Sequence, residues 1–185
     1  MTFYNEHSKV WLSVDCIIFG FDDKKLKILV GKRKMDPGRG QWSLYGGFVG
    51  ATESVDEAAT RTLYELTGLR NVYMRQIGAF GKVDRDPGER VVSVAYYALI
   101  NVGDYDEKLR EAFEAEWVDI ENIPELYSDH NEMVAKARKL VQQGGATVGE
   151  TKITDINYVI TEDMIGTDGL LLRKGKKSYC RLLLI

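Results

Sequence analysis

The stretch Gly46–Leu69, GGFVGATESVDEAATRTLYELTGL, decides the fold. Two glycines end an apolar run, a short polar loop follows, and the residues after Ser54 carry the signals of a helix. Ser54 is suited to cap the first backbone N–H groups, and the carboxylates of Asp56 and Glu57 suit the positive end of a helix dipole. Gly68 is the residue type that ends helices in a left-handed conformation. We therefore predict a loop–helix unit that closes at Gly68.

This predicted helix has an apolar and a polar face. Apolar or small residues recur at helical spacing and form a predicted buried stripe of Val55, Ala59, Thr62, Leu63 and Leu66. Charged residues follow one another at steps of four, at Glu53, Glu57, Arg61 and Glu65. Several carboxylates beside a loop are the ligands that Mg²⁺ takes next to a phosphate. A solvated helix face with Glu–Arg ion pairs has the same pattern, so spacing alone leaves both interpretations open.

The same stretch resembles the Nudix box. That signature is a glycine, a glutamate, an Arg-Glu-x-x-Glu-Glu run and a closing glycine with an aliphatic residue. This chain matches it at Gly47, Glu53, Arg61, Glu65 and Gly68. The resemblance implies the α/β fold class, as a Nudix-type α/β/α sandwich with a mixed sheet.

Two carboxylates of the signature are replaced in this chain. Thr62 stands where the family places a glutamate used as general base, and Leu66 replaces the second of the paired metal-binding glutamates. Loss of a general base alone lowers a rate by about 10²- to 10⁴-fold. The resemblance therefore predicts no catalytic residues, and it leaves Glu65 and Glu53 as a weak or vestigial metal site. We expect no required cofactor, with Mg²⁺ needed only if the chain is an active hydrolase.

A second informative segment is FGKVDRDPGERVVSVAYYALI, residues 80–100. Its Asp-Pro-Gly turn is followed by a nearly continuous β-branched and aromatic run, which is typical of a buried strand. The Arg-Asp-Pro turn and the Arg-Val-Val-Ser-Val-Ala-Tyr run resemble the ADP-ribose-processing branch of the Nudix family and its regulatory relatives. The predicted ligand-binding residues are Arg85, Asp86, Arg90, Gly46, Gly47 and Glu53. Guanidinium groups bind phosphates and sugar hydroxyls, whereas the structural alternative makes both arginines members of loop salt bridges.

The remaining segments predict the rest of the sandwich. Strands are expected at residues 11–21, 26–34, 42–49, 71–80, 91–100 and near 116, and a further helix at 132–142. His130 precedes that helix and has no Ser or Cys partner in a recognisable arrangement. We expect His130 to form hydrogen bonds at the helix start rather than to act in catalysis.

Composition limits the cellular setting. The chain has 185 residues and a formal net charge of −3, so nothing in its overall charge attracts nucleic acid. No apolar run reaches membrane-spanning length, and the N-terminal residues lack a signal-peptide core, so we expect no membrane association. Cys16 and Cys180 suggest neither a disulfide framework nor a metal site. These features predict a cytoplasmic protein.

The C-terminal part differs from the rest. We predict a Nudix-like domain at residues 1–143, a Gly/Thr-rich linker at 144–152, and a hairpin segment at 153–185 that is a partial or replaced winged-helix region. The predicted hairpin has a basic tip formed by Arg173, Lys174, Lys176 and Lys177. Such a tip would suit contacts with DNA phosphates, like the wing of a winged helix. A lysine-guarded edge hairpin that packs on protein is the alternative.

Three functions fit these observations. The prediction is a catalytically impaired Nudix-fold sensor of a sugar or ADP-ribose-like effector, acting as a homodimer in transcriptional regulation. It rests on a resemblance to Nudix-related regulators that respond to ADP-ribose or to sugars such as arabinose. The alternatives are a Mg²⁺-dependent hydrolase of nucleoside diphosphate derivatives, and a catalytically dead module that serves only in assembly.

Overall fold

The structure is a computed structural model that describes residues 3–21, 25–105, 107–143, 146–148, 151–153, 160–166, 169–174 and 178–183. The chain divides into two units, Met1–Val134 and Ala135–Ile185. One helix, α3 (His130–Gln143), begins in the first unit and ends in the second. No helix within the described ranges is long and apolar enough to cross a membrane.

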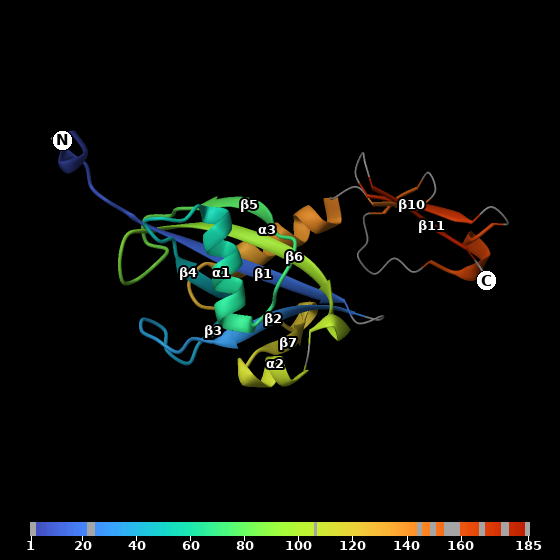
Figure 1. Ribbon diagram of the computed structural model, residues 1–185, viewed down its shortest axis with the longest axis horizontal. Coiled ribbons are helices and arrows are strands. Elements are labelled where there is room, and N and C mark those ends of the chain that lie inside the picture. Colours follow the sequence, from blue (N-terminus) through green and yellow to red (C-terminus); the bar gives the residue numbers. More distant parts are fainter. Residues whose placement is uncertain are drawn as a thin grey trace. The chain divides into compact units, whose positions relative to one another are not determined.

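The first unit is built on a mixed sheet (Figure 1). Its strands are β1 (Trp11–Phe21), β2 (Leu26–Lys32), β3 (Trp42–Ser43), β4 (Tyr45–Phe48), β5 (Arg75–Phe80), β6 (Val91–Asn101) and β7 (Glu116–Asp119). The main path runs β3-β2-β1-β6-β5, while β4 pairs with β1 and β7 pairs with β2. Strands β1 and β6 are parallel over their full length, and the other named pairs of this sheet are antiparallel. The predicted strands are therefore confirmed with two changes: β5 starts at Arg75 rather than at residue 71, and the single strand predicted at 42–49 is divided into β3 and β4.

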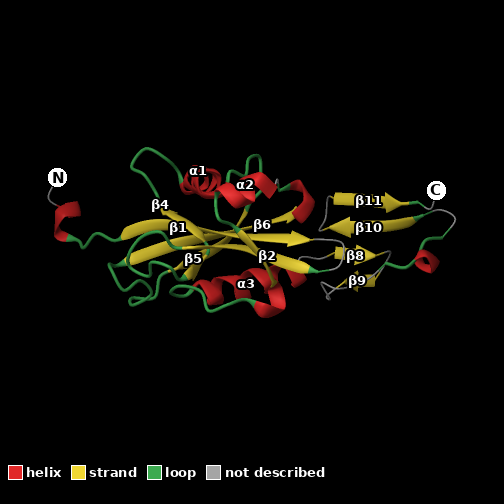
Figure 2. Cartoon of the chain, turned by 90° about the horizontal axis from the view of Figure 1, so that it is seen from below, coloured by secondary structure: helices red, strands yellow, loops and turns green. Residues whose placement is uncertain are grey.

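Helices cover both faces of this sheet. Figure 2 shows α1 (Val55–Thr67) and α2 (Glu107–Ala112) over one face and α3 over the other. The core between α1 and the sheet includes Val14, Ile18, Leu29, Ala59 and Leu63. The three layers confirm the predicted Nudix-type α/β/α sandwich. Sequence reasoning missed α2, whose residues EKLREA are mostly charged and show little apolar periodicity.

Helix α1 begins and ends where its sequence predicts. The Ser54 hydroxyl accepts a bond from the Glu57 backbone N–H at 3.2 Å, and the Glu57 carboxylate accepts one from the Ser54 N–H at 2.8 Å. This reciprocal capping satisfies backbone donors that would otherwise lack partners. Gly68 ends the helix with a φ of 75°, in the left-handed region that favours glycine. The capping chemistry therefore fixes the loop–helix unit.

The predicted buried stripe of α1 needs one correction. Ala59, Thr62 and Leu63 are buried as predicted, but Leu66 is 41% exposed. The reason is local, because Leu66 faces a cavity instead of packed core side chains. Ala58 and Thr67 are buried in addition.

The second unit contains a four-stranded sheet in the order β11-β10-β8-β9. Its strands are β8 (Ala146–Val148), β9 (Thr151–Ile153), β10 (Leu170–Lys174) and β11 (Ser178–Leu182). Strands β10 and β11 pair antiparallel, which confirms the predicted hairpin. The segment predicted as a linker, residues 144–152, contributes β8 and the first residues of β9 to this sheet, since its Thr and Val residues favour strands.

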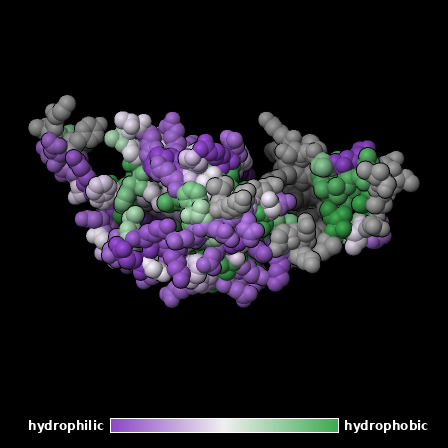
Figure 3. All heavy atoms as spheres, turned by 60° about the horizontal axis from the view of Figure 1, so that its bottom comes forward, coloured by the Kyte–Doolittle hydropathy of each residue, from purple (hydrophilic) through white to green (hydrophobic). Residues whose placement is uncertain are grey.

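Both units expose apolar side chains, among them Trp11 and Tyr73 in the first unit. In Figure 3, hydrophilic residues dominate the visible face of the first unit, and hydrophobic residues gather on the visible face of the second. Exposed apolar side chains of the second unit include Leu171 and Leu183. The tip of the predicted basic hairpin, residues 175–177, lies outside the described residues, and the structure gives only the backbone pairing of Arg173 and Lys174.

Candidate functional site

Arg61 organises the loop and helix that carry the signature. Its Nε and Nη2 donate to the two carboxylate oxygens of Glu53, at 2.9 and 2.7 Å, and its Nη1 donates to Glu65 at 2.9 Å. Nη2 also donates to the Phe48 carbonyl at 2.9 Å, and the Gly50 N–H donates to Glu53 at 2.7 Å. The predicted polar face is therefore an ion-pair network that fastens the loop onto the helix.

This network affects the ionisation of its members. The hydrogen bond from Arg61, followed by that from the Gly50 N–H, lowers the pKa of Glu53 to about 2. The hydrogen bonds of Glu53 and Glu65 in turn raise the pKa of Arg61. Glu53 and Arg61 are therefore both charged at neutral pH, which keeps the bidentate pair intact.

Arg61 competes with any cation for the carboxylates at this site. Both carboxylate oxygens of Glu53 and one of Glu65 already accept bonds from Arg61, so a cation bound there would have to share these oxygens with a guanidinium. Over the part of the chain that the structure describes, no cluster of three or more His, Cys, Asp or Glu side chains is placed to hold a metal ion. The metal pair Glu65 and Glu53 stays a prediction.

Thr62 occupies the position of the family's general base and is packed rather than accessible. It is 2% exposed, and its hydroxyl has no hydrogen-bond partner. A Cβ added to Gly47 would lie 2.7 Å from this hydroxyl oxygen, so the helix and the Gly46-Gly47 strand are in close contact here. A buried threonine hydroxyl does not act as a base at neutral pH.

A cavity of about 480 Å³, which we call the box cavity, opens beside the C-terminal half of α1. Its lining residues come from β2 and the loop after it, from β3–β4, and from the ends of α1 and α2: Gly31, Lys32, Arg33, Lys34, Met35, Ser43, Leu44, Tyr45, Gly46, Glu65, Leu66, Ala112 and Phe113. Three cationic side chains and one carboxylate line it, while Leu66, Met35 and Phe113 supply apolar surface. This combination suits an anion that also carries an apolar or ring-shaped part.

Aromatic rings hold two of these cations. The Arg33 guanidinium lies 3.9 Å from the centre of the Tyr127 ring, and its Nε donates to the Pro37 carbonyl at 2.9 Å. The Lys32 ammonium lies 5.0 Å from the centre of the Trp42 ring. Such contacts restrict a long side chain without neutralising its charge. Arg33 and Lys32 are therefore ordered charges at the box cavity.

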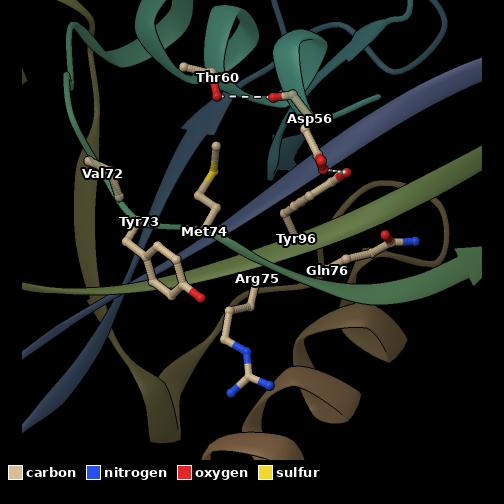
Figure 4. Close-up of a pocket in the computed structure, with 8 residues that line it drawn as sticks. All are labelled: Asp56, Thr60, Val72, Tyr73, Met74, Arg75, Gln76 and Tyr96. Atoms are coloured by element: carbon tan, nitrogen blue, oxygen red, sulfur yellow. Dashed lines mark hydrogen bonds between the residues drawn. The ribbon is translucent and has the colours of Figure 1, made fainter. Parts of the chain in front are cut away.

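A second cavity, of about 370 Å³, lies on the opposite side of α1 (Figure 4). It is lined by Asp56, Thr60, Val72, Tyr73, Met74, Arg75, Gln76 and Tyr96. Tyr96 donates its hydroxyl to Asp56, as Figure 4 shows. None of the predicted ligand-binding residues lines this cavity.

Arg85 is enclosed by protein carboxylates. Its Nε and Nη2 donate to Asp129 at 3.0 and 2.8 Å, and Nη2 lies 3.5 Å from Asp15. Arg85 is only 8% exposed and lines neither cavity. These contacts favour the salt-bridge alternative for Arg85.

Asp86 and Arg90 are also engaged locally. Asp86 accepts the Gly88 N–H at 2.8 Å, which is turn chemistry. Arg90 donates to the carbonyls of Gly81 at 3.0 Å and Lys82 at 3.2 Å. Of the six predicted ligand-binding residues, Gly46 alone lines the box cavity; Glu65, predicted for metal, joins it there.

Five side chains form a buried polar cluster that sequence reasoning did not assemble: Asp15, Arg85, Ser93, Asp129 and His130. Ser93 donates to Asp15 at 2.6 Å, and Nε2 of His130 lies 3.5 Å from Asp15. Nδ1 of His130 accepts the Leu44 N–H at 3.2 Å, so His130 is a hydrogen-bonding residue at a helix start, as predicted. The one signal in the sequence was an acidic residue, Asp15, within the apolar run of β1.

Comparison with known proteins gives consistent matches. The NUDIX domain model matches residues 9–140. The chain is 34% identical over 130 residues to the ADPR responsive transcriptional repressor NtrR of Acinetobacter baylyi, a match covering 68% of this chain and 52% of that protein. It is also 34% identical over 126 residues to the ADP-ribose pyrophosphatase of Methanocaldococcus jannaschii, covering 68% of this chain and 74% of that enzyme. The chain therefore spans about half the length of the repressor and most of the enzyme.

Solved structures of NrtR from Shewanella oneidensis share the fold. The protein itself superposes with a TM-score of 0.67 at 28% identity, over 76% of this chain and 67% of that one. Its complex with a 27mer DNA gives 0.66 at 28% identity, over 74% and 64%. Its NUDIX domain complexed with ADP ribose gives 0.61 at 26% identity, over 74% and 92%.

Proposed function

Because this chain belongs to the Nudix domain family, we propose that it is a ligand sensor that binds ADP-ribose, hydrolyses it poorly, and acts in transcriptional regulation. The observation that carries this proposal is that the box keeps its structural ion pairs but lacks two carboxylates of the signature. Arg61 still fastens Glu53, Glu65 and the Phe48 carbonyl, so the loop before α1 remains tied to the helix. The general-base position is a buried threonine, and a metal-ligand position is a leucine.

The box cavity is the proposed ligand site. ADP-ribose carries a pyrophosphate between two ring systems. The cavity offers the cations Lys32, Arg33 and Lys34, of which Lys34 also pairs with Glu114 at 3.0 Å, and Glu65 is the one carboxylate among its lining residues. These cations would take the charge that a bound metal supplies in a hydrolase, so binding is expected without magnesium. Leu66 leaves an apolar wall where a ligating carboxylate would otherwise stand.

Similarity to the two regulators supports the effector and the DNA partner. The Acinetobacter protein is named as ADPR responsive, and the Shewanella protein was crystallised with ADP ribose and with DNA. A free sugar such as arabinose is the alternative effector. We propose that the second unit contacts DNA phosphates through Arg173–Lys177, within a cytoplasmic homodimer. Retardation of duplex DNA at low salt, lost after combined Ala substitution of Lys174, Lys176 and Lys177, would support this contact, and unaffected retardation would refute it.

An ADP-ribose pyrophosphatase is the second candidate. The 34% identity to the Methanocaldococcus enzyme favours it, as do the retained Glu53, Arg61 and Glu65. It would need Mg²⁺ at carboxylates that Arg61 already occupies. The sensor needs no metal ion at these carboxylates and is the function that the site supports best.

A thermal-shift titration locates the ligand site. The full chain is titrated with ADP-ribose and separately with arabinose, each in EDTA and in Mg²⁺. Ligand at about 100 times its Kd should stabilise the protein by roughly 2.7 kcal/mol. Arg33→Ala should weaken ADP-ribose binding by about tenfold or more, because a hydrogen bond to a charged group contributes about 1.5–3 kcal/mol.

Arg39→Ala is the matched control, since Arg39 lies in the same loop, pairs with Asp36 at 3.6 Å, and does not line the box cavity. Its affinity should equal that of the unmodified protein. Equal affinities of Arg33→Ala and Arg39→Ala for ADP-ribose would show that the ligand binds outside the box cavity. Absence of any stabilisation by ADP-ribose would refute the proposed effector.

A further inference from the structure

Two residues that line the box cavity contact the imidazole of His130 directly. The Leu44 N–H donates to Nδ1 at 3.2 Å, and the Ser43 hydroxyl oxygen lies 3.3 Å from the same nitrogen. Because Nδ1 accepts a hydrogen bond, the ring hydrogen of the neutral imidazole is on Nε2, which faces Asp15 at 3.5 Å. The ring therefore joins the wall of the cavity to the buried polar cluster.

Two further lining residues reach the same ring through one neighbour each. Gly46 abuts Asp15 so closely that an added Cβ would lie 2.2 Å from the carboxylate oxygen that faces His130. Arg33 stacks on Tyr127, whose ring centre is 5.8 Å from that of His130 in an edge-on arrangement. Four residues that line the cavity therefore contact His130 or one of its immediate neighbours.

His130 is also the first residue of α3. The Asp129 carbonyl accepts the N–H groups of Glu132 at 3.0 Å and Met133 at 3.2 Å, and the Asp129 carboxylate holds Arg85. Met133 and Ala137 are completely buried, so the start of the helix is fixed by packing as well. The helix continues to Gln143, past the boundary at which the second unit begins.

We propose that His130 is a positioning residue that couples occupancy of the box cavity to helix α3 and, through that helix, to the second unit. This inference rests on the proposed function, because it assigns the step between effector binding and the C-terminal part. A ligand that shifts Leu44 shifts the donor of a buried hydrogen bond, and a densely packed interior passes the shift to the acceptor. The accepting imidazole belongs to the first residue of α3, so the helix moves with it as a rigid element.

Two substitutions separate this role from a merely structural one. His130→Asn keeps a hydrogen-bond acceptor near the position of Nδ1 and so retains the partner of Leu44. His130→Gln places its amide near the position of Nε2, which keeps a polar partner for Asp15 but removes the acceptor for Leu44. Both side chains are neutral and polar, and each keeps one of the two contacts of the ring while it loses the other. His7→Leu, at the exposed second histidine, is the control for losing a histidine.

Hydrogen–deuterium exchange of the full chain, with and without saturating ADP-ribose, tests the coupling. In the unmodified protein, in His7→Leu and in His130→Asn, the ligand should change exchange at least threefold in α3 and in peptides covering residues 146–153. In His130→Gln, affinity for ADP-ribose should stay within about threefold of the unmodified protein while the change beyond the first turn of α3 is lost.

Three results would overturn either the inference or the proposed function. Ligand binding with no exchange change in α3 of the unmodified protein would overturn the inference and leave the proposed sensor standing. A full response in His130→Gln would also overturn it, since the acceptor for Leu44 would then be dispensable. Failure of ADP-ribose to bind at all would instead overturn the proposed function, and the inference with it.

Discussion

The guanidinium of Arg85 lies between the carboxylates of Asp129 and Asp15 in the interior of the first unit. Its removal would leave two buried carboxylates without a countercharge. Breaking a buried pair by deleting one partner typically costs about 3–5 kcal/mol. We therefore predict that Arg85→Ala lowers the free energy of unfolding by that amount, measured by urea denaturation.

Arg90→Ala serves as the control for this experiment. Arg90 donates only to backbone carbonyls at the part-exposed start of β6, so its loss should cost about 1 kcal/mol. Comparable stabilities of Arg85→Ala and the unmodified protein would contradict the buried ion pair and return Arg85 to the list of ligand-binding candidates.

His130 makes stability depend on pH. Burial lowers the pKa of His130 below its ordinary value of 6.5, despite the opposing influence of Asp15. Below pH 6.5 the unfolded chain therefore binds a proton that the folded protein does not, and stability falls as pH decreases. The slope for one proton is at most about 1.4 kcal/mol per pH unit. We predict a loss of stability between pH 7.5 and 5.5 in urea denaturation.

The carboxylates with lowered pKa values do not contribute to the change in stability between pH 7.5 and 5.5. Glu53 and Glu57 have ordinary values of 4.5, so their stabilising contribution is present above that pH and is lost only at lower pH. In His130→Asn the loss between pH 7.5 and 5.5 should be much smaller. Identical pH dependences of the two proteins would contradict the buried neutral imidazole.

At the scale of single residues, the sequence indicates the chemical type of a side chain better than it indicates which residues that side chain contacts. It proposed both a ligand contact and a salt bridge for Arg85, and only the fold brings in Asp129, which lies 44 positions away. Asp15 and Ser93 are 78 positions apart and meet because β1 and β6 pair in parallel. Such long-range pairings are set by strand register, which a local pattern does not contain.

Helix α1 makes a prediction about restoring the box. Leu66 is 41% exposed beside a cavity, so Leu66→Glu should change the unfolding free energy by no more than about 0.5 kcal/mol. Thr62 is packed against Gly47, so the larger, charged side chain of Thr62→Glu should destabilise the protein by about 1–3 kcal/mol. Urea denaturation of the two single variants measures both values. Equal effects of the two substitutions would show that the two positions are not packed differently.

Elements with strong local signals were predictable, and weakly patterned ones were not. The caps of α1, the β1–β2 strands and the β10–β11 hairpin follow from residue types at fixed spacing. Strands β8 and β9 are three residues each, too short to show an alternating pattern, and so the segment was interpreted as a linker. The box cavity was not predictable, because its walls come from five separate elements, β2, β3, β4, α1 and α2.

At the scale of the whole molecule, the box keeps its structural contacts while two of its signature carboxylates are replaced. The loop, the helix caps and the Arg61 network that define the Nudix box are intact. The general-base position is occupied by a buried threonine, and the adjoining cavity is cationic without a free carboxylate pair. We therefore propose that the protein retains ligand recognition and hydrolyses its ligand poorly.

Isothermal titration of the full chain with ADP-ribose, in EDTA and in Mg²⁺, followed by chromatography of the recovered ligand, tests this account most directly. We predict saturable binding of equal affinity in both buffers and recovery of intact ADP-ribose. Turnover should be at least about 10²-fold below the roughly 1–10³ per second of ordinary enzymes. Binding only with Mg²⁺, accompanied by release of AMP and ribose 5-phosphate at an ordinary enzymatic rate, would contradict it.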